Sequence, residues 1–184
     1  SSGNSKPKYD WIYKVRDSFQ SKVSIENFQP LYYERNTSEG KYQVNNKIFF
    51  QEKEELILME LDNNEEGFRQ ISLAYQTGIL DLQTAVYYAR MLNFEDARMG
   101  DGYDFNIIID GKPYSIPIRY EGKELIHLKN KSYSCYRIST QVIEGTIFKS
   151  GQTILVWVSD DGKQIPVKVV APIIVGRVKA ELVE

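Results

Sequence analysis

Residues 153–170 read TILVWVSDDGKQIPVKVV, two apolar runs joined by a short polar segment. Branched and aromatic side chains dominate both runs, which is typical of strands with half-buried faces. Asp160-Asp161-Gly162 supplies the residues that a tight turn needs between them. The stretch therefore predicts an antiparallel hairpin, and it indicates a chain built from hairpins.

The same alternation of apolar and polar residues recurs along most of the chain. It predicts strands at residues 9–16, 19–25, 31–35, 42–50, 56–61, 68–73, 105–109, 114–120, 125–128, 133–143 and 174–182. Turn-forming residues separate them at 36–40, 62–67, 110–111 and 121–122. About ten antiparallel strands rarely stay flat. We therefore expect a mainly β fold, a curved antiparallel sheet that is barrel-like or a sandwich.

One segment departs from this pattern. After Gly78, apolar side chains recur at helical spacing at Ile79, Leu82, Val86 and Ala89. Asp81 stands where it can cap the first turn. This predicts one amphipathic helix over residues 81–92, packed against the sheet.

Length and charge bound the kind of protein. A chain of 184 residues with 42% hydrophobic content suits a single β-rich domain over residues 1–184, in which we expect residues 1–8 to be flexible. The formal net charge is −2 and the signs alternate, so no nucleic-acid partner is expected. No apolar run approaches the roughly 20 residues of a membrane-spanning helix, so we expect no transmembrane segment in this chain.

Few residues offer catalytic or metal-binding chemistry. The sequence has 1 His, His127, and 1 Cys, Cys135, which excludes a zinc site with several histidines and an internal disulfide. His127 is expected to hydrogen-bond on a strand, and Cys135 to fill the core. Acidic residues at 95–104 are expected to form a solvated loop, and Asp160-Asp161 to form a turn and not an acid pair. No cofactor and no metal are expected.

Aromatic residues are frequent, with 13 Tyr, 8 Phe and 2 Trp. They could simply fill the core, or they could line a ligand cavity if the sheet closes. The candidate ligand-binding residues are Tyr13, Tyr33, Tyr87, Tyr88, Arg90, Tyr120 and Trp157. For the arginine, pairing with a structural partner is the alternative to anchoring a ligand.

Four stretches point to a known family: residues 9–17 (YDWIYKVRD), 85–90 (AVYYAR), 142–149 (VIEGTIFK) and 156–167 (VWVSDDGKQIPV). With them the chain resembles the domain of unknown function 3108, an uncharacterised family of exported bacterial proteins, in its Bacteroidetes form. The resemblance implies export to the periplasm or association with the outer membrane. It also implies that strands usual upstream of residue 9 are missing here. The family has no established catalytic residues.

Together these observations favour binding over catalysis. We expect a non-enzymatic cell-envelope domain that binds an apolar or amphipathic, lipid-like ligand or an envelope protein partner. A purely structural or interaction module is one alternative. The other is a carboxylate-dependent hydrolase acting on envelope glycans, which would require two acids to converge across a cleft.

Overall fold

The computed structural model describes residues 1–129, 131–141, 152–172 and 176–183. The motif at 142–149, the end of the strand expected at 133–143 and the start of the one expected at 174–182 lie outside these residues. Strands form two sheets and are accompanied by one α-helix, so the prediction of a mainly β fold is confirmed. Each sheet has an edge strand at both ends, so neither closes on itself within the described residues.

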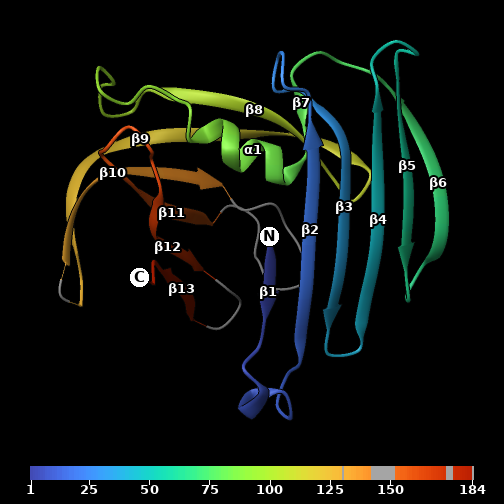
Figure 1. Ribbon diagram of the computed structural model, residues 1–184, viewed down its shortest axis with the longest axis horizontal. Helices are drawn as coiled ribbons and strands as arrows, with labels where there is room; N and C mark the ends of the chain where they lie inside the picture. The colour runs from blue at the N-terminus through green and yellow to red at the C-terminus, as the bar shows by residue number, and fades with distance from the viewer. Residues whose placement is uncertain (130, 142–151, 173–175, 184) are drawn as a thin grey trace. The chain divides into compact units, whose positions relative to one another are not determined.

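The first sheet is a six-stranded antiparallel meander in sequence order (Figure 1). Its strands are β1 (Ser2–Asn4), β2 (Val15–Val23), β3 (Pro30–Glu39), β4 (Tyr42–Gln51), β5 (Leu56–Asn63) and β6 (Gly67–Ala74). A short 3-10 helix, η1 (Pro7–Tyr9), lies between the first two strands.

The second sheet has seven strands in the order β13-β12-β11-β10-β9-β8-β7. They are β7 (Ile79–Leu80), β8 (Gly102–Ile109), β9 (Lys112–Leu128), β10 (Lys131–Gln141), β11 (Thr153–Ser159), β12 (Pro166–Pro172) and β13 (Arg177–Glu181). The pairing of β7 with β8 is parallel. The hairpin expected at residues 153–170 is confirmed as β11 and β12.

The chain divides into two compact units, each with its own core. The first comprises Ser1–Val86 and Asn106–Tyr114, and the second Tyr87–Phe105 and Ser115–Glu184. The core of the first unit contains Tyr33, Ile48, Phe50, Ile57, Met59, Leu61, Ile79 and Ile108. The second unit buries Ile126, Cys135, Trp157 and Val167 together. Buried positions alternate with more exposed ones along β4 and β5, as the period of two requires.

Two local predictions near the start of the chain are wrong. Residues 9–16 were expected as one strand, but η1 and a turn precede β2, which begins at Val15. Residues 36–40 were expected as a turn, but β3 continues to Glu39 and pairs with Tyr42. Gly40, at φ +61°, and Lys41 then suffice as a two-residue hairpin turn. Burial of Thr37 explains the extra strand length, since it lies on the inner face with 4% exposure.

The turn expected at residues 121–122 is also absent from the structure. β9 runs unbroken through these residues, and its pairing with β10 shifts register opposite Gly122. Gly122 has φ +105°, a conformation that side-chain-bearing residues avoid. The glycine therefore serves a β-bulge, which bends the long strand without ending it.

The expected helix is α1 (Leu82–Ala89), shorter than the predicted range. Asp81 caps it as expected: its carboxylate accepts hydrogen bonds from the Thr84 backbone N–H at 2.9 Å and the Thr84 hydroxyl at 2.6 Å. The Ser21 hydroxyl of β2 also donates to Asp81, at 2.6 Å. This buried network turns the Thr84 side of the helix inward. Leu82 and Val86, which the spacing placed on the core side, are 39% and 47% exposed.

The tip of the β8–β9 hairpin is held on the inner face of the first sheet. Asp110 Oδ1 accepts hydrogen bonds from Arg35 at 2.9 Å and Asn46 at 3.0 Å. Gly111, at φ +84°, lies so close to the sheet that a Cβ atom there would stand 2.7 Å from methyl groups of Leu61 and Ile71. The hairpin tip therefore depends on a residue without a side chain.

Replacing Gly111 by alanine should lower the free energy of unfolding by about 2–4 kcal/mol, because it adds a clash to an unfavourable φ. Gly67→Ala is the matched control, since Gly67 has φ +75° and nothing within 4 Å of its would-be Cβ. That control should lose only about 1–2 kcal/mol. Urea denaturation of both variants measures the difference, and equal losses would contradict the close contact.

Candidate functional site

Three of the seven predicted ligand-binding residues lie in the cores. Tyr33, Tyr120 and Trp157 are 5%, 6% and 5% exposed. Tyr120 stacks on Phe94 with ring centroids 5.8 Å apart. The Trp157 indole N–H donates to Glu124 at 2.8 Å. These three side chains contribute to packing in the structure.

The other four lie nearer the surface. Tyr13 is 52% exposed and covers Gly40, and Tyr87 is also 52% exposed. The Arg90 guanidinium lies 5.3 Å from the centre of the Tyr87 ring and donates to the backbone carbonyls of Lys163 and Gln164. Tyr88 meets Phe105 edge-on. The structure thus brings Arg90 and Tyr87 together, whereas Tyr13 lies in the first unit. Ligand binding by the seven candidate residues stays a prediction.

The outer face of the first sheet carries a polar groove of about 360 Å³. Side chains that alternate with the core residues point to this face because successive strand residues face opposite sides. We call it the amide groove, and its outward-facing side chains are Arg16, Asn36, Ser38, Gln43, Asn45, Asp62 and Asn64. They form rows across the strands: Asn36 stands opposite Asn45, which stands opposite Asp62.

The charged side chains that line the amide groove are one of each sign, Arg16 and Asp62. Arg16 pairs with Asp10, whose pKa is lowered chiefly by the hydrogen bond from Arg16 and then by that from Ser5. Asn36 donates to Glu34 at 3.0 Å. Each side-chain amide can donate and accept at once, which matches groups that do the same, hydroxyls above all. The groove therefore suits a neutral ligand rich in hydroxyl groups.

An apolar patch follows on the same face, formed by Tyr32, Phe49 and Leu58. Tyr32 stands opposite Phe49, and their ring centres are 5.3 Å apart. Phe49 stands opposite Leu58 on the next strand. Lys22 lies 5.3 Å from the centre of the Tyr32 ring. This outer face thus joins a polar groove to an aromatic patch along the same strands.

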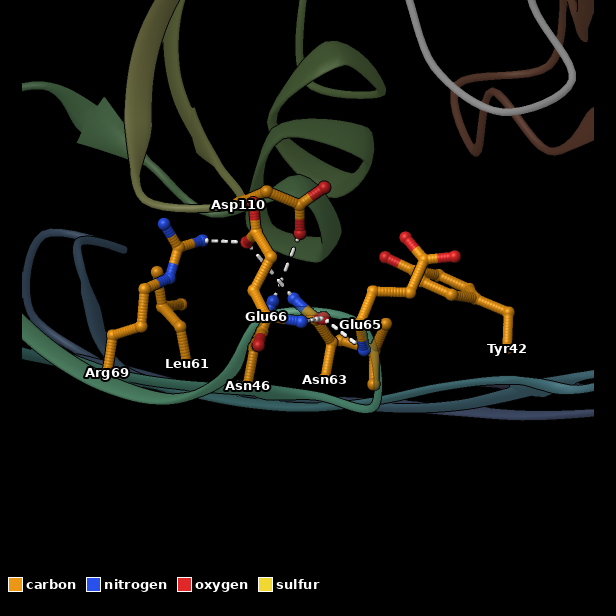
Figure 2. Close-up of a pocket in the computed structure, with 9 residues that line it drawn as sticks. Tyr42, Asn46, Leu61, Asn63, Glu65, Glu66, Arg69 and Asp110 are labelled. Carbon is orange, nitrogen blue, oxygen red and sulfur yellow. Dashed lines mark hydrogen bonds and ion pairs between the residues drawn. The ribbon is translucent and has the colours of Figure 1, made fainter.

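A second, smaller pocket lies on the inner side of the same unit (Figure 2). Its volume is about 140 Å³, below the roughly 300 Å³ usual for small-molecule sites. Glu66 pairs with Arg69 at 2.7 Å, and Asn63 donates to Glu66. Figure 2 shows Asp110 facing Asn46 across it. Its polar groups are thus largely engaged with one another.

One pair of acids approaches the arrangement that a hydrolase would need. Burial and then the neighbouring Asp17 carboxylate raise the pKa of Glu39. However, the two acids stand side by side on β2 and β3, two residues apart in the strand register. Glycosidase acids instead face one another across the substrate, about 5–9 Å apart. This pair therefore gives the hydrolase alternative little support.

The other groups considered for chemistry are engaged in the structure. His127 Nδ1 lies 2.7 Å from the Ser132 hydroxyl of the paired strand. Cys135 is fully buried, and burial raises the pKa of its thiol to about 11. In the β11–β12 turn, the Asp160 carboxylate pairs with Lys123 of β9 at 2.8 Å. The Asp161 carboxylate accepts a hydrogen bond from the Ser159 hydroxyl. Asp160-Asp161 thus form a turn, as predicted.

Within the described ranges, no three His, Cys, Asp or Glu side chains are grouped so as to hold a metal ion. A helix with the length and apolar character to cross a membrane is likewise absent from this part of the chain.

Sequence reasoning missed the amide groove. The groove residues at 36–40 also fit a turn, and the polar residues of the strand at 42–50 fit an ordinary solvent-facing side. One signal could have found them: polar residues alternate on both sides of Gly40, with Asn36 and Ser38 before it and Gln43 and Asn45 after it. Two adjacent strands with amides or hydroxyls at every second position indicate a polar face.

Asp160→Asn should destabilise the protein more at neutral than at acid pH. The hydrogen bond from Lys123 is the first cause that lowers the pKa of Asp160. A carboxyl group whose pKa is lower in the folded than in the unfolded state stabilises the fold at pH values above its unfolded-state pKa, about 3.9. That stabilisation is lost as the pH falls through the folded-state pKa. The loss at neutral pH should stay below about 1 kcal/mol, because the pair is partly exposed to solvent, which screens it. Thermal unfolding against pH, with exposed Asp96→Asn as control, measures it.

Glu39→Gln should have the opposite pH dependence. The pKa of Glu39 is raised in the folded state, so this carboxyl group stabilises the fold at pH values below its unfolded-state pKa. That stabilisation is lost as the pH rises through the folded-state pKa. Removing the charge should therefore raise the melting temperature at neutral pH relative to the wild type, and change it least in acid. Glu54→Gln, in an exposed turn, is the control. A destabilised Glu39→Gln variant at neutral pH would contradict the assignment.

Comparison with known proteins identifies a family. No curated protein and no solved structure is significantly similar to the chain. The Bacteroidetes form and the missing upstream strands stay predictions. The family model described as "Protein of unknown function (DUF3108)" matches residues 1–183, and the chain therefore belongs to this family.

Proposed function

We propose that this chain is a cell-envelope binding domain that holds an amphipathic ligand on the outer face of its first sheet. The ligand's hydroxyl-rich head would occupy the amide groove, and its apolar part would lie on the patch of Tyr32, Phe49 and Leu58. The observation that carries the proposal is the amide groove itself, a cavity of about 360 Å³ without excess charge.

The chemistry of the groove supports a sugar-like head group. Gln43 and Asn45 are exposed side chains on one strand, and Asn36 and Ser38 lie beside them on the next. A hydroxyl group donates one hydrogen bond and accepts others, so it can use both ends of an amide. An ionic head group would find Arg16 already paired with Asp10.

The spacing along the strands sets the length of the ligand. Phe49 lies four positions after Asn45 on β4, which corresponds to about 14 Å of strand. Lys47, Glu34 and Glu60 form the row between them. A head group of one or two sugar rings with a short alkyl chain spans this distance.

Location and mode of action belong to the same proposal. Export to the periplasm or association with the outer membrane, which the sequence led us to expect, is part of what we propose. The engaged state of Cys135, His127 and Asp160 agrees with a domain that binds and does not catalyse.

Octyl maltoside below its micelle concentration tests the proposal, with maltose and octanoate as its separate halves. We expect the joined molecule to bind more tightly than either half, because it contacts both the groove and the patch. Amide NMR spectra should then shift at the side chains of Gln43 and Asn45 and at the backbone of Phe49. Absence of shifts at the two side-chain amides would refute the groove as the site.

The double variant Gln43→Ala/Asn45→Ala should weaken binding of octyl maltoside about tenfold, since it removes two hydrogen-bonding amides. Gln20→Ala/Gln70→Ala is the matched control, because these glutamines are exposed on the same face outside the groove. Calorimetric titration compares the two variants. Equal affinities would place the ligand elsewhere.

A further inference from the structure

The turn between η1 and β2 presents three consecutive large apolar side chains to solvent. Trp11, Ile12 and Tyr13 are 83%, 64% and 52% exposed. Single apolar residues are common on protein surfaces, but three large ones in succession at this exposure are a candidate interaction site. We call this group the aromatic tip. Figure 1 shows the segment extending beyond the ends of β1 and β2.

The base of the aromatic tip is held in place by polar contacts. The Asp10 carboxylate accepts hydrogen bonds from Ser5 and Arg16, and the Ser5 backbone N–H donates to the Val15 carbonyl at 3.1 Å. The Tyr13 ring lies over Gly40, where a Cβ atom would stand 2.9 Å from it. The tip is therefore preorganised, so little conformational freedom is lost when it binds.

Positive charge surrounds the aromatic tip. Lys6, Lys8 and Lys14 lie within a few residues of it, and Lys41 lies in the turn that Tyr13 covers. Their side chains reach the surface, since all four lysines are exposed. Asp10, the acid closest in sequence, is neutralised by Arg16. The tip therefore joins apolar bulk to several exposed lysines.

We propose that the aromatic tip inserts into the headgroup layer of an anionic lipid bilayer. Trp and Tyr favour the interface between water and hydrocarbon, where one end of the ring stays hydrated. Lysines beside them are attracted to anionic headgroups, each contributing about fivefold in affinity. The charge complementarity selects a bilayer surface over a neutral protein partner. This inference goes beyond the ligand proposed above and does not depend on it.

Flotation with vesicles tests the proposal. The protein should bind vesicles of phosphatidylcholine with phosphatidylglycerol, bind phosphatidylcholine alone much more weakly, and dissociate as salt is raised. Of the 2 tryptophans, Trp157 is buried, so a blue shift of emission and quenching by brominated lipid would report Trp11. Failure to bind the anionic vesicles would overturn the proposal.

Variants distinguish insertion of the aromatic tip from nonspecific membrane binding by any exposed apolar residue. Trp11→Ser/Ile12→Ser should reduce partitioning about tenfold or more, because it removes the inserting side chains. Ile25→Ser/Phe68→Ser is the matched control, since these residues are 101% and 65% exposed elsewhere in the same unit. Lys14→Gln/Lys41→Gln should lose the preference for anionic lipid. If the tip variant and the control variant bind vesicles equally, the proposal fails. The groove variant Gln43→Ala/Asn45→Ala should bind vesicles as the wild type does, because it changes only the amide groove.

Discussion

The first unit depends on the hydrogen bonds that Arg35 and Asn46 donate to Asp110. Both donors lie on the inner face of a sheet whose other inward residues are mainly apolar, and Asn46 is only 6% exposed. A buried amide without a partner costs about 1–3 kcal/mol. The turn at Asp110 supplies that partner. Gly111 lets the turn come close enough to do so, because any side chain there would meet Leu61 and Ile71.

This use of the inner face explains why the candidate site lies on the outer one. Inward polar groups such as Asn46 and Thr37 are occupied with holding the unit together. Outward groups on the same strands have no such task, since each strand alternates its faces. Gln43 and Asn45 remain exposed, next to core neighbours that fix their backbone. A rigid sheet thus presents adaptable amides, an arrangement that favours binding over packing.

The sequence was most informative where one face of a strand is strictly apolar. The hairpin at residues 153–170 and the cap at Asp81 were predicted because local chemistry and the final structure agree there. The sequence predicts a turn at residues 36–40 because amides and hydroxyls favour turns locally, whereas tertiary pairing with β4 keeps residues 36–39 extended. The aromatic residues were ambiguous for a related reason. Burial decides whether Trp157 packs or Trp11 is exposed, and burial depends on contacts distant in sequence.

Arg16 connects the two surfaces proposed here. Its side chain lines the amide groove and also binds Asp10 at the base of the aromatic tip. A guanidinium offers several hydrogen-bond donors in a planar arrangement and keeps its charge. It can therefore bind Asp10 and line the amide groove at the same time. Since the pair is only partly exposed, screening by salt weakens it less than a fully solvated pair. A tip inserted among headgroups would therefore keep the groove beside the bilayer, where an amphipathic ligand would enter with its head first.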